Sequence, residues 1–540
     1  MNENSLFWKL YTLRSTICFF MIMFLFLTCI LRVAAISTID FQSVYSGQNR
    51  MKITVSKQRG TIFDCNMVPI TNSQKKIIAC VSPTPRAVTA ISKVLDGEEL
   101  ESVLTRLKSG KPTLTEVPEA IKCDGIICME VYEHSSSQTP AVHLIGYTDV
   151  DLKGASGLEL AYDDILFSDS DVAVYYECDG KGNILEGAPP TIENDTSVQS
   201  DGIVTTLDIN IQSIAEKAAN YIETGAIVVA ECNTGKIRAS VSRPYFDCTK
   251  TSDYLSKEDS PLLNRAINAY NVGSVFKPCV AIAGIENNKS SFCYTCTGNC
   301  EIIDRHFKCH KADGHGYMNL KSAIANSCNT YFYNFAFNIG GDEIYDTATT
   351  LRFGKPISLC DGISTSSGSL PDKSSLENIA YLANFSIGQG ELLLSPISIL
   401  TLYCSIASDG SYYVPSVIEG SLKDGSFSEY DKGKATRVMK PETAETLREY
   451  LGAVLTEGTG ESAKPKTVSA AGKTATAQTG KFVDGTEICQ GWFCGFFPAD
   501  SPKYTVTVFS ENTLRQTKSC GEIFGMIADE ITALENSAVK

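Results

Sequence analysis

The sequence lacks any excess of positive charge, and this limits the partners that the protein can have. It carries 47 Lys and Arg against 62 Asp and Glu, a formal net charge of −15 over 540 residues. A nucleic-acid partner needs a basic face, so we exclude that class. The bias of a disordered chain is also missing, because 43% of the residues are hydrophobic and 20% are charged. A chain of this length exceeds one core and predicts roughly two to four domains.

Long apolar runs are scarce, because the sequence has a single one. It extends from Ser15 to Leu31, and residues 33–36 continue it beyond Arg32. This length predicts a single membrane-spanning helix. A cleaved signal peptide is the alternative, because Val33-Ala34-Ala35 supplies small residues for cleavage. We favour a retained anchor over residues 15–36.

Basic residues on one side of the run predict its orientation. Lys9 and Arg14 precede the run, whereas the stretch after Arg32 has no further basic residue until Arg50. The positive-inside rule therefore predicts a single-pass protein of the cell membrane, with residues 1–14 as a cytoplasmic tail and the rest outside the cytoplasm.

Cysteine, by contrast, is abundant, with 20 residues. Cys293, Cys296, Cys300 and Cys309 crowd one stretch, so they are the first candidates for disulfides in an oxidising compartment. Together with His306 and His310 they also have the spacing of a zinc site. We favour disulfides or free thiols, and expect no metal and no cofactor. The scattered cysteines are interpreted as small buried hydrophobic residues (Cys232, Cys279, Cys404).

Periodicity predicts a sheet domain in the second half of the chain. Residues 187–201 are rich in Pro, Ser and acids and predict a linker between a domain at 37–186 and one at 202–540. Residues 225–230 and 236–241 flank a turn and predict a hairpin, and residues 491–497 and 504–509 predict a second strand pair. A last helix has its apolar face at Ile523, Phe524, Ile527 and Ile531. Strands at both ends with helical material between them predict an α/β domain with an inserted helical lobe.

Three short motifs in one order carry the chemistry: Ser274-Val-Phe-Lys277, Ser327-Cys-Asn329 and Lys473-Thr-Ala-Thr476. They begin 53 residues apart (274 to 327) and then 146 apart (327 to 473). Each is weak alone, since Ser-x-x-Lys recurs at Ser73/Lys76. The order and spacing of the three motifs are typical of an acyl-serine site. The same set of motifs is known from β-lactamases and penicillin-binding proteins.

The residue types suit that chemistry. A lysine three positions after a serine shares its helix face, so Lys277 can serve as base for Ser274 if burial lowers its pKa. Ser327 can pass a proton to a leaving amine, and the Asn329 amide can hold Lys277 and a substrate carbonyl. Residues 473–477 predict a strand with Lys473 on one face and Thr474 and Thr476 on the other. An extended peptide could add to the edge of that strand.

These motifs resemble those of the class B penicillin-binding proteins, which are membrane-anchored peptidoglycan D,D-transpeptidases. Further matching segments are Arg59-Gly-Thr-Ile-Phe-Asp64, Gly157-Leu-Glu159, Thr206-Leu-Asp208, Asn264-Arg-Ala266, His315-Gly316, Gly388-Gln-Gly390 and Trp492-Phe493. The resemblance implies a transpeptidase domain with a central antiparallel sheet, a mixed α/β dimerisation or pedestal-like domain at 37–186, and one transmembrane helix.

The resemblance also implies a role for each site residue. Ser274 would be the acylated nucleophile, Lys277 the base, and Ser327 and Asn329 the proton relay and orienting amide. Lys473, Thr474 and Thr476 would bind the substrate carboxylate, and the backbone N–H groups of Ser274 and Thr476 would form the oxyanion hole. The substrate would be a D-Ala-D-Ala stem peptide, and β-lactams would trap the acyl-enzyme.

One residue departs from the family pattern, and several alternatives stay open. The family has Gly where this chain has Ala475, so we expect slower acylation by β-lactams without loss of activity. The alternatives are an inactive cell-wall scaffold, a β-lactam sensor, which would need further membrane helices, and a β-lactamase, for which no water-activating carboxylate is evident. No acidic cluster suited to glycan polymerisation is found near the N-terminus, so we expect a separate glycosyltransferase as partner.

Overall fold

The structure is a computed structural model that describes residues 3–37, 50–185, 187–195, 197–303, 305–431, 433–483 and 485–538. Residues 1–2 of the predicted tail, 38–49 of the predicted N-terminal domain and 539–540 at the C-terminus lie outside the described residues. The chain forms two compact units: residues 1–56, 77–130 and 171–194 make the first, and residues 57–76, 131–170 and 195–540 the second. The chain thus passes between the units several times, at all but the last boundary within a strand.

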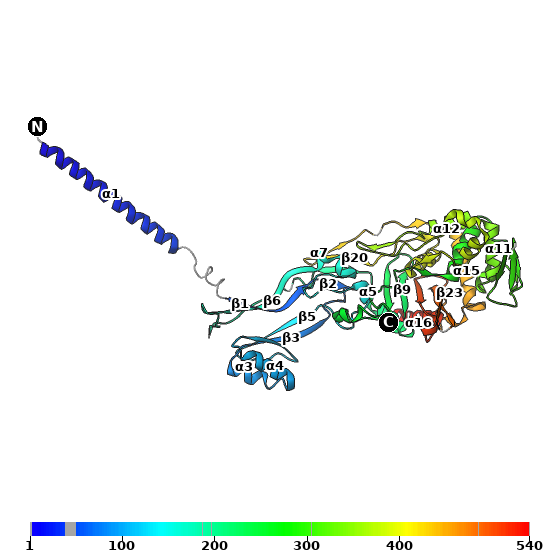
Figure 1. Cartoon of the computed structure of the whole chain (residues 1–540), viewed down its shortest axis with the longest axis horizontal. Coiled ribbons are helices and arrows are strands. Elements are labelled where there is room, and N and C mark those ends of the chain that lie inside the picture. The colour runs from blue at the N-terminus through cyan, green and yellow to red at the C-terminus, as the bar shows by residue number, and fades with distance from the viewer. Residues whose placement is uncertain are drawn as a thin grey trace. The chain divides into compact units, whose positions relative to one another are not determined.

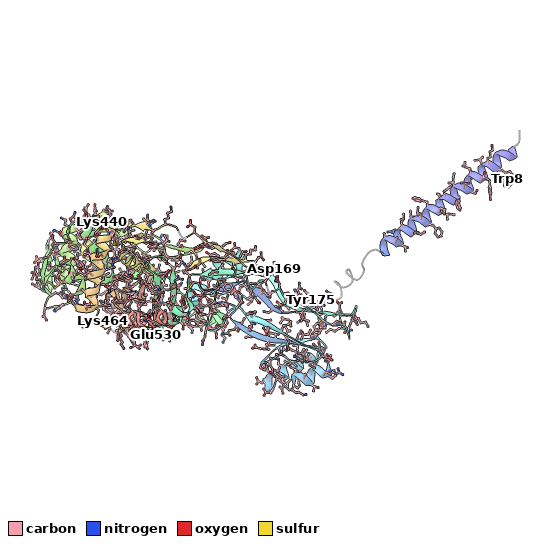
Figure 2. The ribbon with its side chains drawn as sticks, turned by 180° about the vertical axis from the view of Figure 1, so that it is seen from behind. Trp8, Asp169, Tyr175, Lys440, Lys464 and Glu530 are labelled. Carbon is pink, nitrogen blue, oxygen red and sulfur yellow. The ribbon has the colours of Figure 1, made fainter. Side chains whose placement is uncertain are left out.

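Helix α1 (Glu3–Ser37) contains the long apolar run. Its segment Trp8–Ala35 has a mean hydropathy of 2.5 and is the one helix among the described residues long and apolar enough to span a membrane. No part of that segment is buried within the protein, and side chains such as Trp8 project from it into the surroundings (Figure 2). An apolar surface on every side of a helix is what a lipid environment requires.

The rest of the first unit is built from two small sheets and two helices (Figure 1). One sheet has the order β4-β3-β5, and the other has the order β1-β6-β7. Helices α3 and α4 bury Ile91, Val103 and Leu107 in a core shared with Ala79 and Val81 of β3. The elements are β1 (Arg50–Arg59), β3 (Gln74–Val81), α3 (Pro85–Ile91), α4 (Gly97–Leu107), β4 (Thr113–Val117), β5 (Ile126–Glu133), β6 (Phe167–Glu177) and β7 (Thr191–Glu193).

The second unit centres on a five-stranded antiparallel sheet of order β10-β9-β25-β24-β23. Every residue of β25 is buried, so the middle of the sheet is covered on both faces. Phe493 of β24 packs against Phe524 of α16 (Cys520–Ala538), and α14 (Pro396–Ala407) also contacts β24, β25 and β9. The strands are β9 (Gly225–Glu231), β10 (Ile237–Arg243), β23 (Ala471–Val483), β24 (Thr486–Phe497) and β25 (Tyr504–Ser510).

Helical material is inserted between β10 and β23, as the sequence predicts. It carries α9 (Lys277–Glu286), α10 (Leu320–Ala325), α11 (Asn329–Ile339), α12 (Gly341–Thr350), α13 (Ile379–Ser386), α14 (Pro396–Ala407) and α15 (Pro441–Glu457), with short strands β11 (Tyr270–Asn271), β12 (Tyr294–Cys296), β13 (Asn299–Ile302), β14 (Arg305–Lys308), β15 (Gly316–Met318), β16 (Ser358–Cys360), β17 (Ile363–Ser364), β18 (Leu393–Leu394), β19 (Ser411–Tyr412) and β22 (Thr436–Arg437). The 3-10 turns are η1 (Ala219–Tyr221), η2 (Cys248–Tyr254), η3 (Gly273–Phe276), η4 (Lys373–Glu377), η5 (Glu461–Ala463) and η6 (Thr513–Arg515).

A smaller sheet of order β2-β8-β20-β21 completes the second unit. Its strands are β2 (Thr61–Phe63), β8 (Gly202–Thr205), β20 (Ile418–Lys423) and β21 (Ser426–Glu429), and the remaining helices are α5 (Val142–Ile145), α6 (Gly157–Ala161), α7 (Asp163–Leu166), α8 (Ile209–Ala218) and α16 (Cys520–Ala538). One large apolar core unites the sheets and helices of this unit. The predicted fold, an antiparallel sheet with helices and an inserted helical lobe, is confirmed.

Candidate active site

Ser274 lies in the turn η3, which leads directly into α9. The preceding Gly273 has φ +60°, a left-handed conformation that favours glycine. Its N–H donates a hydrogen bond of 2.8 Å to the carbonyl of Gly388, which fixes the turn. Ser274 itself is half-buried, whereas its neighbours Val275 and Phe276 are fully buried. The hydroxyl therefore stands at the start of a helix whose first turn is anchored in the core.

Lys277, one turn further on, is fully buried, and its amine contacts both polar residues of the second motif. Its Nζ donates to the Ser327 carbonyl at 2.7 Å, to Ser327 Oγ at 3.2 Å and to Asn329 Oδ1 at 2.8 Å. It also lies 5.1 Å from the centre of the Phe332 ring. An ammonium group has three donors, so these oxygens use all of them. Among the described residues, the hydrogen-bond partners of Lys277 Nζ do not include Ser274 Oγ.

Burial lowers the pKa of Lys277 to about 7, although the thiols of Cys328 and Cys309 oppose the shift. The ordinary value for a lysine is 10.5. Near neutral pH a substantial share of this amine is therefore unprotonated. Such a group can accept a proton from a hydroxyl on the same helix face.

A strained loop presents Ser327 and Asn329 to Lys277. Ser327 has φ +54°, and its N–H bonds to the Ile324 carbonyl at 3.2 Å at the end of α10. Asn329 is the first residue of α11. A left-handed non-glycine residue costs conformational energy, and such residues gather at functional sites. The turn places the Ser327 hydroxyl and the Asn329 amide on the same lysine.

The third motif lies on β23, the edge strand of the central sheet. Alternation along the strand leaves Lys473 and Ala475 buried and Thr476 exposed. Lys473 Nζ donates to the Thr474 carbonyl at 3.1 Å and to Thr459 Oγ1 at 3.5 Å. Burial, and then the charge of Lys277, lower the pKa of Lys473 well below its usual value. The two lysines therefore belong to one electrostatic site.

Sequence reasoning missed Thr459, which links the third motif to the second. Its hydroxyl lies 3.0 Å from Thr474 Oγ1, and its N–H bonds at 3.0 Å to the carbonyl of Ala325, two residues before Ser327. A threonine in a Gly-Thr-Gly sequence is typical of many turns, so the sequence gives no sign of a functional role. Only the folded chain shows that Thr459 lies beside the third motif.

The methyl group of Ala475 faces the nucleophile's own turn. A Cβ placed on Gly273 would lie 3.5 Å from Ala475 Cβ, and Ala475 is 8% exposed. The extra methyl group therefore lies against the segment that holds Ser274.

All 20 cysteines are free thiols, which is one of the two states that the sequence favours. The four cysteines singled out by spacing are not one group, because Cys293 is exposed and Cys300 packs beside Tyr333. Cys296 and Cys309 instead lie with His315 and with Cys328, the middle residue of the second motif.

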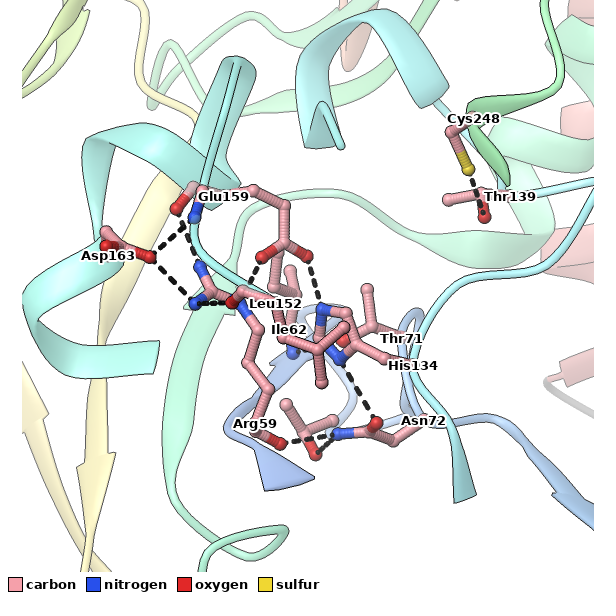
Figure 3. Close-up of polar contacts among 12 residues, drawn as sticks. Arg59, Ile62, Thr71, Asn72, His134, Thr139, Leu152, Glu159, Asp163 and Cys248 are labelled. Carbon is pink, nitrogen blue, oxygen red and sulfur yellow. Dashed lines mark hydrogen bonds and ion pairs between the residues drawn. The ribbon is translucent and has the colours of Figure 1, made fainter. Parts of the chain in front are cut away.

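Two of the segments that match the family pattern, those of Arg59 and Glu159, form a buried polar network (Figure 3). Arg59 Nε donates to Glu159 Oε2 at 2.7 Å, and His134 Nε2 lies 2.8 Å from Glu159 Oε1. Arg59 also bonds Asp163 Oδ1 at 2.7 Å, and His134 Nδ1 lies 3.1 Å from Asn72 Oδ1. Burial acts to raise the pKa of Glu159, but His134 and Arg59 outweigh it and lower this pKa. These landmarks are structural: they tie four segments of the chain together.

Two landmarks support the nucleophile's segment. Trp492 Nε1 donates to the Asn271 carbonyl at 2.8 Å, three residues before Ser274. Arg265 is almost fully buried, and its Nε donates to Glu511 Oε2 at 2.5 Å. Trp492 joins the segment before Ser274 to strand β24 of the central sheet. Arg265 joins it to Glu511, the residue that follows β25. They hold Ser274 in place without touching it.

Comparison with known proteins agrees with this architecture. Residues 225–532, more than half of the chain, match the family model described as "Penicillin binding protein transpeptidase domain". The chain is 26% identical over 495 residues to stage V sporulation protein D of Bacillus subtilis, covering 84% of this chain and 74% of that protein. It is 27% identical over 549 residues to peptidoglycan D,D-transpeptidase MrdA of Acinetobacter baumannii, covering 88% and 80%.

Solved structures share the fold. Penicillin-binding protein 3 of Mycobacterium tuberculosis, complexed with aztreonam, superposes with a TM-score of 0.65 at 22% identity and covers 90% of this chain and 97% of its own.

Proposed function

This chain belongs to the family of penicillin-binding protein transpeptidases, and we propose that it is a serine-type peptidoglycan D,D-transpeptidase. Ser274 is the nucleophile, and the substrate is a stem peptide that ends in D-Ala-D-Ala. The observation that carries the proposal is Lys277: a fully buried amine, one turn after Ser274, held by both polar residues of the second motif. A buried lysine with a lowered pKa is costly for a fold and suits a general base.

In the first half-reaction Ser274 Oγ attacks the carbonyl carbon of the penultimate D-Ala, and its proton passes to the neutral Lys277 amine. The proton then reaches the leaving amine of the terminal D-Ala through Ser327, whose Oγ lies 3.2 Å from Lys277 Nζ. The C–N bond breaks, D-alanine leaves, and an ester joins the peptide to Ser274. In the second half-reaction an amine of a neighbouring strand attacks the ester carbon and forms an amide bond, the ester C–O bond breaks, and the proton lost by the amine passes through Lys277 to Ser274 Oγ.

Substrate binding falls to the edge strand. Lys473, Thr474 and Thr476 bind the terminal carboxylate, and the backbone N–H groups of Ser274 and Thr476 stabilise the oxyanion. Support comes from the place of β23 at the sheet edge, where main-chain groups remain for an added peptide. The same strand edge admits β-lactams, whose ring carbonyl acylates Ser274.

The rest of the chain serves this site. Helix α1 is the retained anchor, with the tail at 1–14 in the cytoplasm and the domain at 202–540 outside it. Residues 37–186 supply the dimerisation or pedestal-like domain, although 57–76 and 131–170 of this range belong to the second compact unit, and 187–201 supply the linker. Glycan strands come from a separate glycosyltransferase partner. Support for the anchor comes from the length and apolar surface of Trp8–Ala35.

The test is covalent labelling of the full chain in detergent by a fluorescent penicillin. We expect labelling of the native protein and none of Ser274→Ala. Intact mass after incubation with a stem-peptide mimic and an amine acceptor should reveal first the acyl-enzyme and then the cross-linked product. Labelling that persists in Ser274→Ala would show the wrong nucleophile. An unlabelled native chain that stays folded would indicate a scaffold.

A further inference from the structure

Three thiols and one imidazole converge beside the second motif. Cys296 ends β12 and pairs with Gly316 of β15, so His315 lies next to it across the two strands. Cys309 follows β14, and Cys328 lies in the loop before α11. One ligand atom from each of the four residues lies within 4.8 Å of all the others. Cys296, Cys309 and Cys328 are buried, and His315 is half-buried.

Three of the six separations between the ligand atoms are close to those of a tetrahedral zinc ion, and the others are within 4.8 Å. With Zn–S of about 2.3 Å and Zn–N of about 2.0–2.1 Å, tetrahedral angles give S···N of roughly 3.6 Å and S···S of roughly 3.8 Å. Here His315 Nδ1 lies 3.6 Å from Cys296 Sγ and 3.5 Å from Cys309 Sγ, and the Sγ atoms of Cys309 and Cys328 are 4.0 Å apart. A neutral imidazole nitrogen has one lone pair or one hydrogen, so hydrogen bonding accounts well for only one of these two thiols.

The backbone around the ligands is shaped for this convergence. Gly298 and Gly314 have φ of +94° and +78°, and a Cβ at these positions would lie 1.8 Å from the Ala312 carbonyl oxygen and 2.3 Å from that of Cys296. The N–H of Cys309 bonds to the Gly298 carbonyl at 2.8 Å. These two glycines therefore allow the backbones of the short strands to approach closely, which brings the ligand side chains together.

We propose that this protein binds one zinc ion through Cys296, Cys309, Cys328 and His315. Three thiolates and an imidazole are the ligands that zinc prefers, and a set of four protein ligands leaves no position for substrate. The site is therefore structural. It joins the hairpins of residues 294–318, which have only short strands of their own, to the helical lobe.

The metal also holds the catalytic loop, a consequence that rests on the proposed function. Cys328 separates Ser327 from Asn329, and both of these bind Lys277. A bond from the metal to Cys328 restrains the turn in which Ser327 has φ +54°. Cys328 is thus a positioning residue: it contacts no substrate and acts through its two neighbours.

The first experiment measures metal in the full chain, purified in detergent under reducing conditions without chelator. We expect about one zinc per chain, released when a mercurial blocks the thiols. Cobalt substitution should give the absorption bands of tetrahedral cobalt with thiolate ligands. Cys309→Ser should lose the metal, Cys309→His should keep it, and Cys300→Ser, a buried cysteine of the same hairpins outside the cluster, should also keep it.

Other outcomes overturn the site. A native chain without zinc that also gives no tetrahedral cobalt spectrum refutes it, as does a disulfide between Cys309 and Cys328 in the reduced preparation. Equal loss of zinc from Cys300→Ser and Cys309→Ser would place the metal elsewhere. Because the measurement on the native chain needs no variant, poor folding of Cys309→Ser does not affect it.

The second experiment separates positioning from overall stability. The metal-free protein is kept folded by working well below its unfolding temperature. Its maximal acylation rate constant should be at least tenfold lower than that of the zinc-loaded protein, while its noncovalent affinity for the penicillin should be unchanged. Readdition of zinc should restore the rate. An unchanged rate constant refutes the positioning role and leaves the zinc site intact. Absence of acylation in zinc-loaded protein would count against the proposed function alone.

Discussion

The buried amine of Lys277 makes acylation depend on pH in a defined direction. Burial disfavours the charged form and lowers the pKa of Lys277 to about 7. Only the neutral amine can take the proton of Ser274, so acylation should rise with pH. With a pKa of about 7, the neutral fraction is about one-eleventh at pH 6, one-half at pH 7 and ten-elevenths at pH 8. The acylation rate should therefore rise about tenfold from pH 6 to pH 8.

The assay follows the loss of a chromogenic β-lactam under single-turnover conditions, with enzyme in excess, over pH 5.5 to 9 in one buffer mixture of constant ionic strength. The β-lactam chosen should carry no group that titrates in this range. Circular dichroism at each pH checks that the protein stays folded. The midpoint of the rate profile then reports the base of the free enzyme.

Lys277→Arg provides the matched control. A guanidinium keeps a positive charge and hydrogen-bond donors for Ser327 and Asn329, but it stays protonated throughout this range. The variant should fold and should acylate too slowly to measure at every pH. A flat native profile, a midpoint near the ordinary lysine value, or the same profile in Lys277→Arg would each refute Lys277 as the base.

Three further predictions concern other parts of the structure. Glu159→Ala should lower the free energy of unfolding by about 3–5 kcal/mol, because it removes the fully buried carboxylate that Arg59 and His134 share and leaves Arg59 only the half-exposed Asp163. Glu449 forms an exposed ion pair with Lys321 at 2.7 Å, so Glu449→Ala should cost under about 1 kcal/mol, and equal shifts in thermal unfolding for the two variants would contradict this contrast. Ala475→Gly should speed β-lactam acylation about three- to tenfold, or roughly 0.7–1.4 kcal/mol of relieved crowding, and an unchanged stopped-flow rate constant would dispose of that idea. Ser327→Ala should slow acylation by about 10²-fold or more as the proton path is lost, whereas a loss below about threefold would exclude Ser327 from the path.

Local patterns in the sequence predict much of the central sheet. The hairpin expected at 225–230 and 236–241 is the pair β9 and β10, and the expected strands at 491–497 and 504–509 are in β24 and β25. Alternation of side chains and turn residues act over a few positions, so they are visible in a linear sequence. The strand order is not, because the pairing of β25 with β9 joins segments more than 250 residues apart.

The candidate site divides in the same way. Motif order predicts that Ser274, Lys277 and Lys473 come together. The fold brings the charge of Lys277 close enough to lower the pKa of Lys473, and Lys277 contacts Ser327 of the second motif, whereas the role of Ser274 stays a prediction. Thr459 and the metal ligands His315 and Cys328 were not identified as parts of one site. Their proximity depends on strand register and on a left-handed turn, which no local pattern specifies.

By itself, the sequence determined the residue types and their spacing: a serine one helical turn before a lysine, an apolar run long enough for a bilayer, and cysteines in excess. Tertiary structure alone decided which of these groups share an environment. Desolvation, which gives Lys277 its lowered pKa, arises from side chains distant in sequence, among them Phe332. The ligand set depends equally on folding, because Cys328 meets Cys309 only after α10 and the hairpins pack together. Chemistry at this site therefore follows from burial and proximity, which are properties of the folded chain.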